Sequence, residues 1–182
     1  MDLRNRRRLQ AGLIAAVFVV PVAIMLGLAL AGWVPHGKSY GARVQPERDF
    51  AHVPVQRADG QAFAWTNRDS VWTMVALPGP DCATRCLRQL DLVHRAQISL
   101  DKSAAKLRLL YLGTSPAGVD AAGFDKVWML ASASSPEFAG LRPAAADSVA
   151  VVLVTPTGMA LTYYAAGFNP EGLRQDLKKA VR

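Results

Sequence analysis

A stretch of 24 residues without a charged side chain, residues 11–34, most constrains how this chain can fold. As a helix it would be about 36 Å long at about 1.5 Å per residue, enough to cross a hydrocarbon core of about 30 Å. Pro21 lies inside the stretch, and transmembrane helices tolerate proline. Trp33 lies near its end, where aromatic side chains anchor helices at the membrane interface. We therefore predict a transmembrane helix over residues 11–34, which explains a hydrophobic content of 51% that is high for a water-soluble protein.

A cleaved signal peptide is the alternative interpretation of the same segment. Ala29-Leu30-Ala31 resembles a signal-peptidase site, and the chain starts with basic residues. The apolar run is longer than the usual signal-peptide core of about 7–15 residues, which favours a retained anchor. Both interpretations export the rest of the chain.

The distribution of charge predicts the orientation of the chain. The first ten residues contain four arginines and one aspartate, and basic flanks stay on the cytoplasmic side. We predict a cytoplasmic tail (residues 1–10), the helix, a linker rich in Gly and Pro (residues 35–49) and a periplasmic or extracytoplasmic domain (residues 50–182). The protein would be a single-pass protein of the inner (cytoplasmic) membrane. The net charge of +7 includes no dense basic cluster in the domain, which argues against nucleic acid as a partner.

The domain alternates strand patterns with helix patterns. Asp59-Gly60 is a hairpin signal, and Asn169-Pro170 is typical of a helix start. We predict strands at residues 70–77, 107–112, 127–130, 149–154 and 159–165, and helices from the cysteine pair to about residue 100 and from Asn169 to the C-terminus. A β-α-β unit followed by a β-β-α unit is the thioredoxin-like arrangement. The predicted fold class is thus α/β, a thioredoxin-like domain with a central mixed sheet flanked by helices, preceded by one transmembrane helix.

The chain has two cysteines, Cys82 and Cys86, placed where the strand at residues 70–77 passes into a helix. A helix N-terminus stabilises thiolate. Arg85 and Arg88 favour the thiolate, whereas Asp81 opposes it. Two sulfurs about one helical turn apart can form a disulfide or hold a soft cation such as Cu(I). A disulfide that closes so short a loop adds only about 2 kcal/mol of stability, but a structural role stays open beside metal handling and thiol–disulfide exchange.

The remaining polar side chains give weaker signals. His94 lies two helical turns beyond Cys86, about 12 Å away along the axis, so it cannot share a metal with both cysteines. The sequence shows no catalytic triad, carboxylate pair or phosphate loop. We expect surface positions for His36 and His52, and core positions for Met74, Met129 and Met159.

These features together resemble those of the Sco family. Its members are membrane-anchored, thioredoxin-fold copper proteins that help assemble the copper centre of cytochrome c oxidase. The resemblance rests on the anchor, the Asp-Gly hairpin, the Cys-x-x-x-Cys motif and the late hairpin, Val-Ala-Val-Val-Leu-Val-Thr-Pro-Thr-Gly-Met-Ala-Leu-Thr-Tyr-Tyr. Sco proteins have proline after the second cysteine, whereas this chain has Leu87. They take a histidine ligand from the loop before the late hairpin, and residues 142–149 contain none. Asp147-Ser148 stand where thioredoxin-type oxidoreductases have a cis-proline.

The resemblance implies a factor that assists cytochrome c oxidase assembly. Cys82 and Cys86 would be both its catalytic residues and its metal ligands, acting by thiol reduction or by handling Cu(I) at the oxidase copper site. The implied partner is the oxidase subunit that carries this site. Two alternatives stay open: a general thiol–disulfide oxidoreductase of the cell envelope, and a non-catalytic docking protein of the oxidase.

Overall fold

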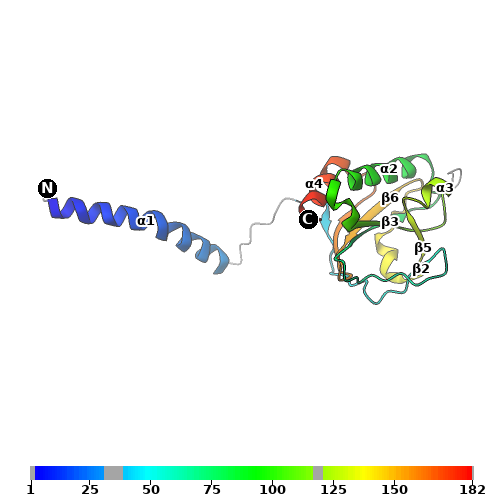
Figure 1. The fold of residues 1–182 in the computed structure, drawn as a ribbon, viewed down its shortest axis with the longest axis horizontal. Coiled ribbons are helices and arrows are strands. Elements are labelled where there is room, and N and C mark those ends of the chain that lie inside the picture. Colours follow the sequence, from blue (N-terminus) through cyan, green and yellow to red (C-terminus); the bar gives the residue numbers. More distant parts are fainter. Residues whose placement is uncertain (1–2, 31–38, 117–120, 182) are drawn as a thin grey trace. The chain divides into compact units, whose positions relative to one another are not determined.

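The computed structural model of the chain describes residues 3–30, 39–116 and 121–181 (Figure 1). The chain divides into an N-terminal unit and a compact unit, Ser39–Arg182. The two units are described separately. Trp33, His36 and the first residues of the predicted linker lie outside the described residues.

The N-terminal unit contains one helix, α1 (Leu3–Leu30), with Pro21 in its interior. Four consecutive side chains, Val17, Phe18, Val19 and Val20, are each at least half exposed. Because consecutive residues of a helix point in different directions, this part of α1 is apolar on all sides. Among the described residues, no helix is both long and apolar enough to be counted as a membrane span. A helix is confirmed over residues 11–30 of the predicted span, whereas residues 31–34 lie outside the described residues. Membrane crossing is taken up below as a proposal.

The described part of the compact unit contains a seven-stranded mixed sheet with the order β1-β7-β6-β3-β4-β5-β2. β3 lies at its centre, parallel to β4 and antiparallel to β6. The predicted strands at residues 107–112 and 149–154 are confirmed residue for residue. The bounds are β1 (Ala42–Arg43), β2 (Gln56–Arg57), β3 (Trp72–Pro78), β4 (Leu107–Leu112), β5 (Met129–Ser132), β6 (Val149–Val154) and β7 (Ala160–Tyr164).

Two long helices cover one face of the sheet (Figure 1). α2 (Thr84–Ile98) connects β3 to β4, and α4 (Pro170–Ala180) follows the β6-β7 hairpin. Asn169 caps α4 as predicted, since its side chain accepts hydrogen bonds from the Glu171 and Gly172 amides. The β-α-β and β-β-α units confirm the thioredoxin-like α/β fold. The shorter helical segments are η1 (Asp101–Lys106), α3 (Ala121–Phe124) and η2 (Pro136–Leu141).

Successive side chains along each strand point to opposite faces of the sheet, so the apolar ones form one core on each face. The core beneath α2 and α4 includes Met74 and Val151, whereas the core on the opposite face includes Val75 and Val152. Because β3 and β6 are covered on both faces, they are continuous apolar runs rather than alternating ones. The opposite face is covered by η2 and the segment before β3, through Phe50, Phe63, Trp65 and Phe138.

A buried carboxylate fixes the start of the compact unit. Asp176 of α4 is 7% exposed, and its Oδ2 accepts hydrogen bonds from the Tyr40 amide at 2.7 Å and the Gly41 amide at 3.1 Å. The hydroxyl groups of Ser39 and Tyr164 donate to the same oxygen at 2.9 and 3.1 Å. The chain is therefore held against α4 from Ser39 onward.

Candidate dithiol site

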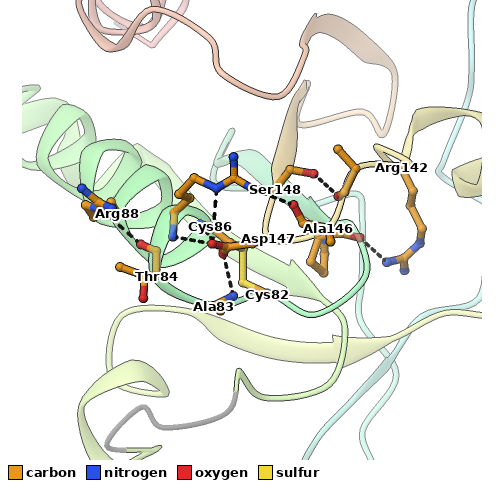
Figure 2. Close-up of a disulfide and its surroundings, with 12 residues drawn as sticks. Cys82, Ala83, Thr84, Cys86, Arg88, Arg142, Ala146, Asp147 and Ser148 are labelled. Atoms are coloured by element: carbon orange, nitrogen blue, oxygen red, sulfur yellow. Dashed lines mark hydrogen bonds and ion pairs between the residues drawn. A yellow bond between two sulfur atoms is a disulfide. The ribbon is translucent and has the colours of Figure 1, made fainter.

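The two cysteines form a disulfide at the start of α2 (Figure 2). Their Cα atoms are 5.2 Å apart, within the usual range of about 4.4–6.8 Å. α2 begins at Thr84, so Cys82 precedes the helix and Cys86 lies in its first turn. Cys86 is 0% exposed and packs in the core, whereas Cys82 is half-buried. The bond is therefore approachable through the sulfur of Cys82.

The loop before β6 packs directly against the turn that leads to the cysteines. The amide of Gly79 donates to the carbonyl of Ser148, and the amide of Asp147 donates to the carbonyl of Pro80, both at 2.9 Å. A β-carbon at residue 79 would lie 2.5 Å from the carbonyl oxygen of Ala145. Glycine is therefore required at this position for the two segments to approach so closely.

Asp147 caps α2 from this loop, 61 to 64 residues away in the sequence (Figure 2). One carboxylate oxygen accepts from the amides of Ala83 at 2.8 Å and Cys86 at 3.0 Å, and the other accepts from the amide of Arg85 at 3.0 Å. The helix needs this partner because its first amides have no acceptor within the helix, and Ala83 at the N-cap has no side-chain acceptor. A single carboxylate thus holds the turn between the two cysteines.

These contacts stabilise the charged form of Asp147. The pKa of its carboxyl is lowered to about 2, mainly by the hydrogen bond from the Cys86 amide and next by the one from Arg85. The guanidinium of Arg85 adds an ion pair with 3.4 Å between Nε and Oδ2. Asp147 itself has a φ of 51°, a left-handed conformation that Asp and Asn adopt more readily than most residues. The carboxylate of Asp147 is therefore ionised beside the disulfide at neutral pH, in an ion pair with the exposed Arg85.

A pocket of about 270 Å³ opens beside Cys82. Burial raises the pKa of the Tyr111 hydroxyl to about 12, although the positive charge of Arg142 acts in the opposite direction. Tyr111 is therefore neutral at physiological pH and adds no charge to this pocket. The pocket gives a sulfur of another protein room to approach Cys82. Its lining is formed by Pro78, Gly79, Asp81, Cys82, Ala83, Tyr111, Thr114, Ser115 and Pro116.

The other predicted residues lie away from the disulfide or serve in packing. His52 is exposed, and Met74 is buried in the core. His94 is half-buried and lines a different pocket, together with Phe124 and Trp128. Arg88 donates to the Thr84 carbonyl of its own helix at 3.4 Å. Within the described residues, no group of three or more His, Cys, Asp and Glu side chains could hold a metal ion.

The sequence did not reveal the role of Asp147. Its position in the loop before β6 was identified, but its hydrogen bonds depend on how that loop packs against the start of α2. The sequence carried no local signal for this contact, because Asp81 and Thr84 near Cys82 are themselves residue types that cap helices.

Comparison with known proteins agrees with this architecture. Residues 72–182 match the family described as "Transmembrane-like, thioredoxin-like, C-terminal domain". The chain belongs to this family. The matched segment begins with β3 and includes the disulfide, both long helices and the late hairpin. No curated protein matches the chain in sequence.

The fold of this chain is similar to that of Sco proteins. Arabidopsis thaliana ScoI, solved with copper bound, is similar with a TM-score of 0.51 and 14% identity, over 79% of this chain and 99% of that one. Yeast Sco1, also solved with copper bound, gives a TM-score of 0.51 at 11% identity, over 79% of this chain and 93% of that one. At sequence identities this low, the structural similarity shows that the chain has the thioredoxin-like fold.

The lowered pKa of Asp147 predicts a pH-dependent contribution to stability. Its pKa is about 2 in the folded chain against 3.8 when unperturbed. The ionised carboxylate therefore stabilises the fold fully above about pH 4, and this stabilisation is lost as the pH falls towards 2. We expect Asp147→Asn to lower the free energy of unfolding at pH 7, and the difference from the wild type to shrink between pH 4 and pH 2. Denaturant unfolding at several pH values measures it, and a difference that stays constant down to pH 2 would contradict the assignment.

Proposed function

We propose that the chain carries out thiol–disulfide exchange with other proteins through Cys82 and Cys86. The observation that carries this proposal is the disulfide at the start of α2, with Cys82 half-buried and Cys86 fully buried. Such an arrangement gives the two sulfurs different roles, because only one of them can be reached by another protein.

In the reductive direction the reduced pair acts on a disulfide of a target protein. The thiolate of Cys82 attacks one target sulfur, the target disulfide breaks, and its second sulfur leaves as a thiolate that takes up a proton. The thiolate of Cys86 then attacks Cys82 in the mixed disulfide and releases the first target sulfur. The products are a target dithiol and the Cys82–Cys86 disulfide, so two electrons have passed from the chain to the target.

A purely structural role explains the pair less well. A disulfide that closes a loop of about five residues adds only about 2 kcal/mol by restricting the unfolded chain. The same turn is already held by the three amide hydrogen bonds to Asp147. The domain also has two extended apolar cores, so its stability does not depend on a disulfide as that of very small domains does.

The proposed target is the copper site of cytochrome c oxidase. The chain resembles the Sco family in its motifs and shares the fold of two Sco proteins that were solved with copper bound. Cysteines that bind copper must be reduced first, because a thiolate and not a disulfide is the ligand. A membrane-attached reductant would supply these thiolates on the oxidase subunit that carries the copper site.

The proposed location is the inner (cytoplasmic) membrane. α1 is apolar on all sides over residues 17–20, as expected of a helix in lipid. The four arginines in the first ten residues favour a cytoplasmic N-terminus and a periplasmic compact unit. In that oxidising compartment the pair would rest as the disulfide described above.

Carriage of Cu(I) is the second candidate function. The short spacing of the two cysteines, with their Cα atoms 5.2 Å apart, favours joint ligation by both sulfurs once the pair is reduced. Thiolates are soft ligands that select Cu(I). Copper would then be cargo held by Cys82 and Cys86 and passed to the thiolates of the oxidase site.

The exchange mechanism predicts different products for the two single cysteine variants. In Cys86→Ser the mixed disulfide at Cys82 cannot be resolved, so we expect it to accumulate with the target protein. Cys82→Ser, whose remaining thiol is buried, should trap at least tenfold less. Alkylation of whole cells, purification of the chain and mass spectrometry of the partner measure this.

The identity of the trapped partner separates the alternatives. The oxidase subunit with the copper site is the expected partner, whereas a broad set of exported proteins would indicate a general oxidoreductase. Normal oxidase activity in the double variant Cys82→Ser/Cys86→Ser, together with loss of activity on deletion, would instead indicate a docking protein.

Cu(I) carriage predicts one equivalent of tightly bound Cu(I) on the reduced full chain. Anaerobic titration with Cu(I) against a competing chelator measures it. Cys86→Ser should lose this binding because one thiolate remains, whereas His94→Ala should keep it because His94 lies two helical turns away. Equal binding by the wild type and by Cys86→Ser would refute the two-sulfur site.

Membrane insertion predicts that the full chain stays in the membrane pellet after alkaline carbonate extraction. A variant that lacks residues 11–34 should appear in the soluble fraction, because it has lost the apolar segment. Protease added to spheroplasts should digest the compact unit if it faces the periplasm. Release of the full chain by carbonate would count against a retained anchor.

A further inference from the structure

The start of α2 differs from the usual environment of a reactive cysteine. Free amides at a helix N-terminus normally stabilise a thiolate and make the dithiol easier to form. Here the amides of Ala83, Arg85 and Cys86 all donate to Asp147. They are therefore already engaged by a carboxylate and are not available to a cysteine sulfur.

Attack on the disulfide develops a second negative charge at this point, on the sulfur that leaves before it takes up a proton. An incoming thiolate attacks Cys82, because Cys86 is 0% exposed, so the sulfur of Cys86 is the leaving group. The amide of Cys86 lies 3.0 Å from Oδ1 of Asp147, and the departing thiolate therefore develops close to a carboxylate. Like charges repel each other, and the nearby cation, Arg85, is already paired with the same carboxylate at 3.4 Å, so both the departure and the thiolate form of the reduced pair are disfavoured.

The same contacts favour the disulfide through geometry. The three amides belong to the turn that joins the two cysteines, and one carboxylate holds this turn with the Cα atoms 5.2 Å apart. A turn held in this conformation keeps the two sulfurs at bonding distance. Less conformational freedom is then lost when the disulfide forms.

We propose that Asp147 is a positioning residue that lowers the reduction potential of the Cys82–Cys86 pair. This inference rests on the exchange function proposed above and gives it a direction. A pair with a low potential gives its two electrons to a target disulfide and ends as the disulfide, as in the reductive sequence already described. The chain is thus a reductant, and a dithiol protein of still lower potential must return it to the reduced state.

The test is the redox equilibrium of the full chain in detergent with a dithiothreitol buffer at pH 7. Alkylation of free thiols and mass spectrometry give the reduced fraction at each buffer ratio. We expect Asp147→Asn to shift the equilibrium constant about tenfold or more towards the dithiol, which equals about 30 mV for each factor of ten in a two-electron couple. We also expect faster reduction by the buffer. Asn fits the left-handed backbone at residue 147, so the variant removes the charge and leaves the turn possible.

Two further variants make the result decisive. Asp147→Gly should shift the potential in the same direction, because glycine adopts a φ of 51° without strain. Asp101→Asn is the matched control, since Asp101 is exposed and has a φ of 50° at the start of η1. Its potential should equal that of the wild type.

The outcomes distinguish this inference from the proposed function. A purely structural role for Asp147 would lower the unfolding free energies of the oxidised and reduced chain equally and leave the potential unchanged. A change of less than twofold in both Asp147 variants would thus overturn the inference, while reversible cycling of the pair would still support exchange. Failure of the wild type to cycle in any thiol buffer would sink the exchange function itself.

Discussion

The contact on which the site depends joins the carboxylate of Asp147 to the first turn of α2. It satisfies amides that a helix cannot satisfy by itself, and it fixes the backbone between Cys82 and Cys86. It also fastens the loop before β6 to the end of β3, together with the backbone hydrogen bonds of Gly79 and Asp147. The disulfide, the helix start and the loop before the late hairpin therefore meet at this contact.

The packing around this contact leaves Cys86 buried and Cys82 more accessible. Cys86 belongs to the core beneath α2, next to residues of the central strands, whereas Cys82 borders a pocket that is open to other molecules. In the proposed exchange, burial of Cys86 would protect the resolving sulfur, and the partial exposure of Cys82 would allow attack by another sulfur. An asymmetric pair of this kind suits two-step chemistry better than it suits a staple, whose stabilisation over such a short loop is small.

The cysteine pair, in which the chain resembles Sco proteins, lies beside the loop before β6, in which it differs from them. The loop before β6 lacks the histidine that Sco proteins supply to copper, and it contributes Asp147 in that region instead. We propose that this carboxylate, whose oxygens are engaged by three amides, acts on the cysteines through charge and backbone geometry. This arrangement supports the proposed redox role of the two sulfurs, and copper enters the proposal as Cu(I) cargo of the same two thiolates.

The sequence determined the main strands and the two helices of the compact unit that flank the sheet, and their order, whereas the tertiary structure decided the surroundings of the cysteine pair. The strands at residues 107–112 and 149–154 and the Asn169 cap could be predicted because each depends on its own apolar run or neighbouring residues. So could the position of the cysteine pair between strand and helix. The partner of that helix start could not be predicted, because Asp147 lies 61 residues beyond Cys86 and is brought to it by the pairing of β6 with β3. Local sequence patterns do not predict such a contact, because it arises when distant segments pack together.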